Sequence, residues 1–385
     1  MEKDCQMDNT PTSSDHKNSA TAKQSLLGKK GRGAISNEGS RYNTHTSFRD
    51  SDGWETPQVE EGLVAELTAP VATEIFADQT KKIITTNRSP DINFSQSINP
   101  YKGCEHGCIY CFARPTHAYL DLSPGLDFET KIFYKAGAKE RLMAELAKPK
   151  YQCSTIAMGT NTDPYQPIEK KLKITRQILE VMVQTKHPVS IVTKSTLILR
   201  DIDLLQQLAQ LGLVSVNISV TCLENSLKTI LEPRTANPGA RVRAIKSLNE
   251  AGVPTGAMLA PIIPFINDHE IENMVETCAN AGAVNLAYIL LRLPLEVAPM
   301  FEQWLHLHYP LKAKRVMSAV YATRGGKAYD AKWHKRMIGQ GPIAQLLQKR
   351  FHNAKQKYLT EQRTTITPRC DLFEPPNESS QMNLF

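Results

Sequence analysis

The stretch Gly103-Cys104-Glu105-His106-Gly107-Cys108-Ile109-Tyr110-Cys111 decides how this sequence is interpreted. It places three cysteines in a C-x3-C-x2-C pattern, with an aromatic residue directly before the last one. Three thiolates on one short loop can hold three corners of a 4Fe-4S cube, whereas four cysteines complete the ligation of an electron carrier. The pattern therefore predicts a cluster on Cys104, Cys108 and Cys111 whose remaining iron is free to bind and activate a small molecule.

Zinc is the main alternative ligand for this loop, because soft thiolates suit both metals. A structural zinc ion requires a fourth ligand, and His106, His117 and Cys153 are available for that role. Three cysteines can also fall close together by chance in a chain that contains eight. Gly103 and Gly107 fit a tight loop in either case, so the spacing favours the cluster without excluding zinc.

The length and composition suit a large intracellular α/β protein. With 385 residues, the chain can form one large domain with tails or two smaller domains. No apolar run is long enough for a membrane-spanning helix, and the chain starts with the polar sequence Met1-Glu2-Lys3-Asp4 rather than a signal peptide. We therefore expect a cytoplasmic protein without membrane association, since a reducing compartment suits an oxygen-sensitive cluster.

The net charge of +7 is unevenly distributed along the chain. Residues 311–369 hold fourteen Lys or Arg residues against two acidic residues, Asp330 and Glu361, so this segment carries +12 and the rest is near −5. Five aromatic residues are interleaved with the positive charge: Tyr321, Tyr329, Trp333, Phe351 and Tyr358. Such a stretch is typical of a surface that binds DNA or RNA. A solvated amphipathic helix would have the same composition, and both interpretations remain open.

The residue pattern divides the chain into four parts. Residues 1–70 are polar for most of their length and predict a disordered tail. Residues 71–300 alternate between strand and helix patterns and predict the core domain. Residues 301–370 predict a basic, helical carboxyl-terminal extension, and residues 371–385 a flexible tail.

The core domain contains six short apolar or β-branched segments with the composition of strands. They are Ser97–Asn99, Ser154–Gly159, Val189–Thr193, Val214–Val220, Gly256–Ala260 and Leu286–Leu293. Helical patterns lie between them, at Lys139–Ala147, Ile174–Gln184, Ile202–Leu211, Gly239–Ala251 and Glu270–Ala281. Six strand–helix units in succession predict an α/β fold with a parallel sheet curled into a barrel or part of one.

Polar residues follow several of these strands, at the edge where such barrels build their active sites. The cysteine loop follows the first strand. The later polar groups are Thr160-Asn161-Thr162-Asp163, Lys194-Ser195, Ser219 with Thr221-Cys222, and Asn267-Asp268. We therefore expect them to converge on one mouth beside the cysteine loop.

The cysteine pattern and the six-strand alternation resemble the partial (β/α)6 TIM-type barrel of radical S-adenosylmethionine (SAM) enzymes, over about residues 90–300. Three segments are similar to the spore photoproduct lyase-related branch: Ser97-Ile98-Asn99-Pro100-Tyr101-Lys102-Gly103-Cys104, Tyr110-Cys111-Phe112-Ala113-Arg114 and Leu231-Glu232-Pro233-Arg234. The resemblance implies a 4Fe-4S cluster and SAM as cofactors, with the methionyl group of SAM on the free iron. An electron donor such as flavodoxin or ferredoxin would reduce the cluster. SAM would then be cleaved to a 5′-deoxyadenosyl radical that abstracts hydrogen from a substrate.

The resemblance further implies which residues surround SAM. Tyr110 is expected to pack near the adenine. Asn161, Thr162 and Asp163, after the second strand, are expected to meet the methionyl ammonium. Lys194, after the third strand, is expected to pair with the carboxylate, although an exposed loop lysine is the alternative.

Two further residues are expected to contact SAM, and one cysteine is a candidate for catalysis. Ser219 could bond the ribose or the carboxylate, or be an ordinary strand hydroxyl. Arg234 could bind a carboxylate through its two-pronged side chain, or pair with Glu232. Spore photoproduct lyase has a hydrogen-donating cysteine after its second strand, but Met158-Gly159-Thr160-Asn161 has no thiol. Cys222 is therefore considered as a displaced donor, with a structural thiol as the alternative.

The substrate is not defined by these motifs. The basic segment 311–369 makes DNA or RNA the leading substrate class, with a peptide or small molecule as alternatives. His117 and Tyr119, shortly after the cysteine loop, could contact the substrate or screen the cluster, with packing as the alternative. Arg292, at the open side of the partial barrel, could bind phosphate. Arg292 could instead pair with Glu296 four residues later. A non-catalytic iron–sulfur or zinc protein that binds nucleic acid remains the alternative to an enzyme.

Overall fold

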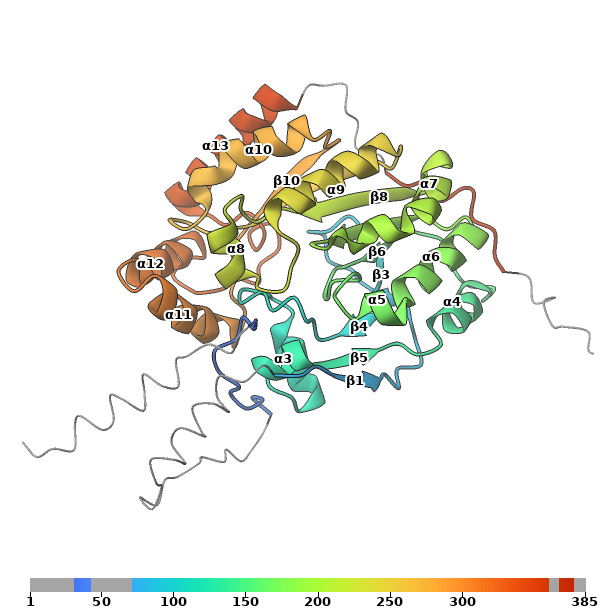
Figure 1. The fold of residues 1–385 in the computed structure, drawn as a ribbon, viewed down its shortest axis with the longest axis horizontal. Coiled ribbons are helices and arrows are strands. Elements are labelled where there is room, and N and C mark those ends of the chain that lie inside the picture. The colour runs from blue at the N-terminus through green and yellow to red at the C-terminus, as the bar shows by residue number, and fades with distance from the viewer. Residues whose placement is uncertain (1–30, 43–70, 360–366, 377–385) are drawn as a thin grey trace, which may run out of the picture.

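The computed structural model describes residues 31–42, 71–359 and 367–376, and its centre is a seven-stranded sheet. Its strand order is β10-β9-β8-β7-β6-β3-β2, and the short β2 (Thr85–Thr86) is antiparallel at one edge. The six parallel strands are β3 (Gln96–Ile98), β6 (Ile156–Met158), β7 (Val189–Thr193), β8 (Val214–Ser219), β9 (Thr255–Ile262) and β10 (Leu286–Leu290). Within the described residues no pairing joins β10 to β3, so the sheet forms a partial barrel with one open side (Figure 1). The predicted α/β fold is confirmed.

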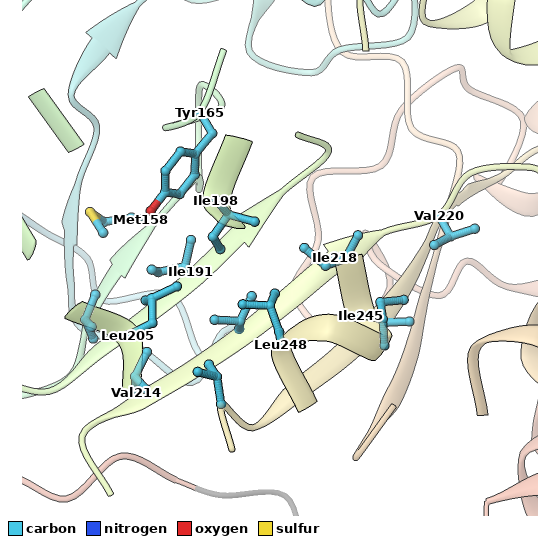
Figure 2. Packing of buried hydrophobic residues seen from close by; sticks show 14 of the residues in the cluster. Met158, Tyr165, Ile191, Ile198, Leu205, Val214, Ile218, Val220, Ile245 and Leu248 are labelled. Carbon is cyan, nitrogen blue, oxygen red and sulfur yellow. The ribbon is translucent and has the colours of Figure 1, made fainter. Parts of the chain in front are cut away.

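Helices between the strands pack against the sheet and bury its apolar side chains. They are α4 (Ala138–Leu146), α5 (Glu169–Leu172), α6 (Ile174–Gln184), α7 (Ile202–Gln210), α9 (Pro238–Glu250) and α10 (Ile271–Asn280), with the 3-10 helices η2 (Thr196–Asp201) and η3 (Asp268–Glu270). Strand residues such as Ile191 and Ile218 meet Leu205 and Leu248 from the helices (Figure 2). Each such side chain contributes roughly 1.5–3 kcal/mol when it is fully removed from water, and this layer fixes the position of the strand ends.

A second, three-stranded sheet carries the cysteine loop. Its order is β1-β5-β4, from β1 (Glu74–Ala77), β5 (Lys131–Tyr134) and β4 (Tyr101–Lys102). The cysteine loop begins directly after β4 and leads into the 3-10 helix η1 (Arg114–Leu120) and the short helix α3 (Leu126–Thr130). The Tyr101 backbone pairs with Tyr134 of β5, so this sheet holds the base of the loop.

The predicted carboxyl-terminal extension is helical. It consists of α11 (Val297–His308), α12 (Ala313–Thr323) and α13 (Gly341–Tyr358), with α8 (Asn225–Leu231) beside α11 (Figure 1). Trp304 of α11 is fully buried and donates its indole N–H to the carbonyl oxygen of Ile230 at 2.9 Å. Helix α13 packs along α10 and buries Leu347 and Phe351. These helices are amphipathic, so much of the basic charge of residues 311–369 lies on the outer faces of packed helices. The boundaries at residues 300 and 370 stay predictions.

The chain between α12 and α13, residues 324–340, is here called the connector. It touches both ends of the seven-stranded sheet. Met337 accepts a hydrogen bond from the backbone N–H of Leu290 in β10 at 2.9 Å. At the other end, Arg336 forms an ion pair of 2.5 Å with Asp91, which lies between β2 and β3. The backbone N–H of His334 also donates to Asp91, at 2.6 Å. The connector therefore crosses the open side of the partial barrel.

Residues 31–42 correct the prediction that residues 1–70 form a disordered tail. Ala34 and Ile35 are buried, and their segment packs beside the cysteine loop. A Cβ atom at Gly33 would lie 1.7 Å from the carbonyl oxygen of Gly107, so only glycine allows this approach. The segment is held by its backbone N–H groups and by the close approach that Gly33 allows. The hydropathy of the sequence reveals neither of these features. The rest of the predicted tail lies outside the described residues.

Residues 367–376 likewise correct part of the predicted flexible tail at 371–385. The backbone N–H of Glu374 donates to the carbonyl oxygen of Thr185 at 2.9 Å. The Phe373 ring packs against Tyr151 and His187, with ring centroids 5.5 and 5.1 Å away. This segment therefore lies near the amino-terminal ends of the strands, whereas residues 377–385 lie outside the described part. Among the described helices, none is long and apolar enough to cross a membrane.

Candidate iron–sulfur and SAM site

The cysteine loop is fixed by backbone hydrogen bonds to three separate elements. Cys104 donates its N–H to Phe128 at 2.8 Å, and Ile109 donates to Leu231 at 3.2 Å. The carbonyl oxygen of His106 accepts from Arg234 at 3.2 Å. Cys104 and Cys108 are buried, and Cys111 is partly exposed. The loop thus presents its three thiols in one small volume, and the protein surrounds it on several sides.

Two glycines allow the loop to turn this tightly. Gly103 and Gly107 have φ angles of +78° and +67°, in the left-handed region that other residues rarely adopt. A Cβ atom at Gly103 would also lie 2.9 Å from the carbonyl oxygen of Lys131. Any side chain at this position would push the loop off the second sheet.

The three thiols of the loop are a donor set that suits a 4Fe-4S cube. In the described part of the chain, no three His, Cys, Asp or Glu side chains are grouped so that they could hold one ion. Three thiolates that bind a 4Fe-4S cluster each meet a different iron, so they do not need to converge on one point. His117 directs Nε2 to the Lys131 carbonyl oxygen at 3.0 Å, and Cys153 lies before β6, near Cys370 at the opposite rim. The third candidate, His106, is engaged as described next.

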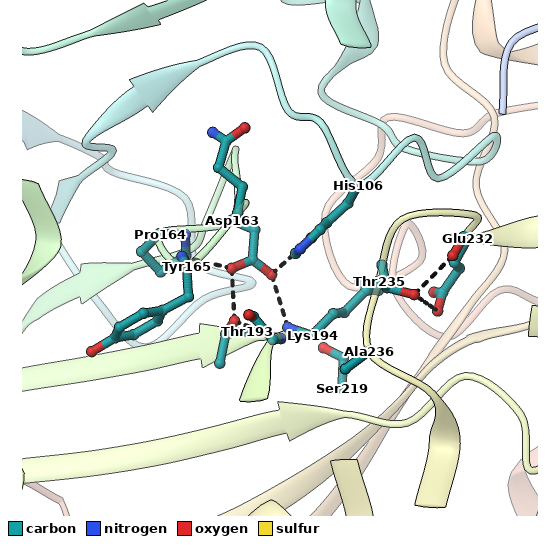
Figure 3. A network of polar contacts seen from close by, with 12 residues as sticks. His106, Asp163, Pro164, Tyr165, Thr193, Lys194, Ser219, Glu232, Thr235 and Ala236 are labelled. Atoms are coloured by element: carbon teal, nitrogen blue, oxygen red, sulfur yellow. Dashed lines mark hydrogen bonds and ion pairs between the residues drawn. The ribbon is translucent and has the colours of Figure 1, made fainter. Parts of the chain in front are cut away.

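Asp163 is the centre of a polar network that joins the loop to the strand ends (Figure 3). One carboxylate oxygen accepts from Thr193 Oγ1 at 2.6 Å, and the other accepts from the backbone N–H of Lys194 at 2.8 Å. His106 Nδ1 lies 3.3 Å from that second oxygen. Burial alone would raise the pKa of Asp163, but His106 and these hydrogen bonds outweigh it and lower the pKa to about 2. Both oxygens of this predicted SAM ligand are therefore already bonded within the protein.

A second buried network surrounds Tyr110. The Tyr110 hydroxyl donates to Glu232, which also accepts from Thr221 Oγ1 at 2.6 Å and forms an ion pair with Arg241. Burial would raise the pKa of Glu232, but Arg241 and then Lys194 outweigh this effect and lower it to about 2. The ammonium group of Lys194 lies 5.8 Å from the centroid of the Tyr110 ring. The hydroxyl end of Tyr110 is thus fixed, while its ring lies beside the Lys194 ammonium group.

The other predicted SAM contacts occupy the same rim. Asn161 donates its backbone N–H to Asn99 at 3.0 Å, and Thr162 donates its hydroxyl to the Tyr101 carbonyl oxygen at 2.7 Å. Ser219 is buried at the end of β8. Lys194 is only partly exposed, and nearby Cys108 and Glu232 outweigh burial and raise its pKa. Lys194 is therefore partly buried beside the cysteine loop, and its contact with SAM stays a prediction.

Arg234 pairs with a residue other than the partner predicted from the sequence. It forms an ion pair with Glu105 of the cysteine loop at 3.1 Å, whereas Glu232 pairs with Arg241. The predicted pairing of Arg234 with Glu232 is therefore wrong, because Pro233 turns the chain between them and Arg241 of α9 reaches Glu232 first. The Arg234 side chain remains about one-third exposed, next to the loop.

Cys222 lies behind the loop in an apolar cluster. It is 2 % exposed and packs in the same cluster as Leu227 and Trp304. Its thiol lies 3.5 Å from the carbonyl oxygen of Glu224. Burial is the main cause that raises the pKa of this thiol, and the negative charge of Glu232 raises it further. These contacts are those of a structural thiol and favour that alternative over a displaced hydrogen donor.

Two buried residues that support the loop were not singled out from the sequence. Gln166 accepts from the Glu105 N–H at 2.9 Å and donates to the Gly103 carbonyl oxygen at 3.1 Å. Glu129 accepts from Arg114, whose Nε donates to the Cys108 carbonyl oxygen at 3.0 Å. Outer residues of this kind orient metal ligands. No local sequence signal marks either residue, since both act through contacts distant in sequence.

Comparisons with known proteins agree with this geometry. A family profile described as the radical SAM superfamily matches residues 98–278, which include the cysteine loop and β6 to β9. An uncharacterised protein of Mycobacterium tuberculosis is 35 % identical over 254 residues, covering 65 % of this chain and 75 % of that protein. An uncharacterised protein of Methanocaldococcus jannaschii is 33 % identical, covering 51 % and 71 %, respectively.

Solved structures of spore photoproduct lyase share the fold. A point mutant of that enzyme has a TM-score of 0.54 at 17 % identity, covering 82 % of this chain and 86 % of the lyase chain. A double mutant with bound SAM and dinucleoside spore photoproduct has a TM-score of 0.53 at 17 % identity, covering 81 % and 85 %. Radical SAM enzymes use a 4Fe-4S cluster and SAM. The family profile, the shared fold and the three-cysteine loop together show that this chain belongs to the radical SAM superfamily.

Proposed function

We propose that this protein is a radical SAM enzyme that holds a 4Fe-4S cluster on Cys104, Cys108 and Cys111. When bound, the cluster and SAM supply a 5′-deoxyadenosyl radical that can abstract hydrogen from a substrate. The observation that carries the proposal is the fixed, enclosed loop with three thiols. The histidines that could have served as a fourth zinc ligand interact with other groups, His106 with Asp163 and His117 with the Lys131 carbonyl oxygen. Burial raises the pKa of the Cys104 and Cys108 thiols, so iron binding would displace their protons.

The residues around the loop have distinct proposed tasks. The Tyr110 ring and the Lys194 ammonium lie together and would contact SAM directly, the ring at the adenine and the cation at the carboxylate. Asn161 and Ser219 are the other candidates for direct contact. Both carboxylate oxygens of Asp163 already accept hydrogen bonds within the protein, which supports a positioning role. In this role Asp163 holds the loop against the ends of β6 and β7.

Two further residues are assigned by their exposure or by their hydrogen bonds. Arg234 is the cation next to the loop that retains an accessible edge, and we retain it as a candidate carboxylate ligand. Thr162 already donates its hydroxyl to the backbone, which supports a role in shaping the turn after β6. The protein's contribution to catalysis is then to orient SAM and to exclude water from the site, as is usual for cofactor enzymes.

Two partners complete the proposal. A small redox protein such as flavodoxin or ferredoxin would supply the electron. DNA or RNA would be the substrate class, supported by the basic segment 311–369. Two cations of this segment are occupied within the protein. Arg324 is buried and donates to the carbonyl oxygens of Leu290 and Leu291, and Arg336 pairs with Asp91. Exposed cations of the connector are the better candidates for contact with a polyanion.

The test is reductive cleavage of SAM under strict anaerobiosis. The reconstituted protein is reduced with dithionite and incubated with SAM, and 5′-deoxyadenosine and methionine are measured. We expect both products from the wild-type protein and neither from a Cys111→Ser variant. A wild-type protein that carries an intact cluster yet forms no 5′-deoxyadenosine would support a non-catalytic nucleic-acid-binding protein instead.

A further inference from the structure

A small pocket lies where the cysteine loop meets the open side of the partial barrel. Its volume is about 200 Å³, and its lining includes Arg41, Phe112, Tyr119, Arg292, Leu295 and Tyr329. Phe112 directly follows the last cysteine of the loop, and Arg292 follows β10. Tyr329 belongs to the connector. The pocket therefore lies between the first and sixth parallel strands, next to the residues that would bind the cluster.

Arg292 brings a positive charge to this pocket without a compensating carboxylate. Its predicted pairing with Glu296 is not formed, because Glu296 pairs with Arg41 at 2.7 Å. Among the residues that the structure describes, Arg292 has no ion-pair partner, and its guanidinium contacts the sulfur of Met337 at 3.6 Å. Burial lowers the pKa of Arg292, as expected for a cation that has lost water without gaining an anion. A bound anion would remove this cost.

The guanidinium of Arg292 is also held in a defined orientation. Its Cζ atom lies 4.0 Å from the centroid of the Phe112 ring. A guanidinium stacked in this way keeps the N–H groups at its edge available for paired hydrogen bonds to a phosphate or carboxylate. Because Phe112 directly follows Cys111 in the sequence, an anion bound to Arg292 would lie close to the proposed reaction centre.

Exposed aromatic rings surround this cation. Tyr119 is 71 % exposed and Phe112 is 41 % exposed. The Tyr119 ring contacts the Arg41 guanidinium, with Cζ 5.4 Å from its centroid, and the Tyr42 ring, whose centroid lies 5.7 Å away, yet most of its surface is still accessible to a ligand. Unpaired nucleobases bind proteins by stacking on rings of this kind. A planar group and an anion can thus be bound side by side.

The connector extends the positive charge beyond the pocket. Lys327, Lys332 and Lys335 are exposed, and so is the ring of Trp333, at 59 %. The cavity itself is smaller than the ~300–1,000 Å³ typical of sites that enclose a whole small ligand. Its size suits one unit of a longer molecule, and the lysines outside it suit a chain that continues with repeated negative charge.

We propose that this pocket binds one nucleotide unit of a single-stranded nucleic acid, with its phosphate on Arg292 and its base against Tyr119. This inference rests on the proposed function and identifies its substrate class. A peptide rich in carboxylates would satisfy Arg292 and the lysines, but it would leave the exposed rings without a planar partner. Duplex DNA presents no unstacked base to Tyr119. The geometry therefore favours a single strand.

Fluorescence anisotropy with a labelled single-stranded oligonucleotide tests the proposal on the full-length, reconstituted protein without SAM. Arg292→Gln should weaken binding about tenfold, since a charge-assisted hydrogen bond is lost. The slope of log affinity against log salt should also fall by about 0.7, the value for one phosphate contact on a single strand. Tyr119→Ala should weaken binding about fivefold or more through lost stacking, but should leave the salt slope unchanged. Lys246→Gln, on the exposed face of α9, is the matched control and should bind like the wild type.

Several results would overturn the proposal. These are wild-type affinity and salt slope in Arg292→Gln, an equal loss in Lys246→Gln, or displacement of the oligonucleotide by polyglutamate at equal charge. The last result would point to an acidic peptide. If Arg292→Gln does not fold, as judged by thermal unfolding, Arg292→Lys and Tyr119→Ala test the proposal in its place. Arg292→Lys should bind the oligonucleotide more weakly and keep the salt slope, and Tyr119→Ala should behave as stated above. Absence of SAM cleavage by the wild type, with these binding effects intact, would reject the proposed function and leave this site standing.

Discussion

Replacement of Glu129 by Gln should destabilise the protein by about 3–5 kcal/mol, the usual cost of removing one partner from a buried ion pair. Glu129 and Arg114 are both fully buried, with 2.5 Å between the carboxylate and the guanidinium. The same carboxylate accepts the backbone N–H groups of Gly33 and Ala34 at 3.0 and 2.8 Å. The amide of Gln keeps the shape but leaves the Arg114 charge uncompensated. The loss is a large share of the ~5–15 kcal/mol by which proteins are usually stable.

Urea denaturation and limited trypsin digestion measure the two consequences of this change. The midpoint should fall with an unchanged slope, and trypsin should cleave faster after Arg32 and Arg41, because residues 31–42 lose their anchor. Glu302→Gln is the control, since Glu302 is exposed on α11 and its replacement should stay within about 0.5 kcal/mol of the wild type. A Glu129→Gln variant as stable and as protease-resistant as this control would refute the reasoning.

Three further predictions concern the thiols, acid stability and the connector. Cys111→Ser should lose iron and the absorbance of the cluster, while Cys370→Ser should keep both; equal iron content in the two variants would argue against the ligand assignment. Burial lowers the pKa of His187 from 6.5 to about 4. As the pH falls from 6.5 to 4, the unfolded chain therefore binds a proton that the folded protein does not. The free energy of unfolding decreases over that range by at most ~3 kcal/mol. His187→Gln should flatten this decrease in urea titrations, and an unchanged pH profile would contradict it. Asp91→Asn should loosen the connector and speed trypsin cleavage after Lys332, and wild-type digestion rates would show that Asp91 is not its anchor.

The strands and helices of the core were predictable because their residues repeat with a short period. The bounds of α6 and β7 agree with the structure residue for residue. Apolar side chains every three to four residues, or alternating residues on a strand, are local properties that a sequence displays directly. The cysteine loop was also predictable from a local pattern, since its three cysteines lie within eight residues.

The contacts around the site were not predictable, because they join residues far apart in sequence. Glu129 reaches Gly33 and Ala34, and Tyr110 reaches Glu232. The segment 31–42 has too few apolar residues to signal burial, and glycine and backbone N–H groups provide its anchors.

Arg234 shows the same limit in a single residue. Proximity in sequence suggested Glu232 as its partner, but the fold brings Glu105 to it instead. Long-range pairs of this kind follow from the topology of the barrel and have no period of their own.

Mössbauer spectroscopy of anaerobically prepared, iron-57-enriched protein, with and without SAM, tests the central claim most directly. The account predicts a 4Fe-4S cluster in which one iron site differs from the other three and shifts when SAM is added. A cluster whose four sites remain equivalent and indifferent to SAM, or a thiol site occupied by zinc, would contradict it.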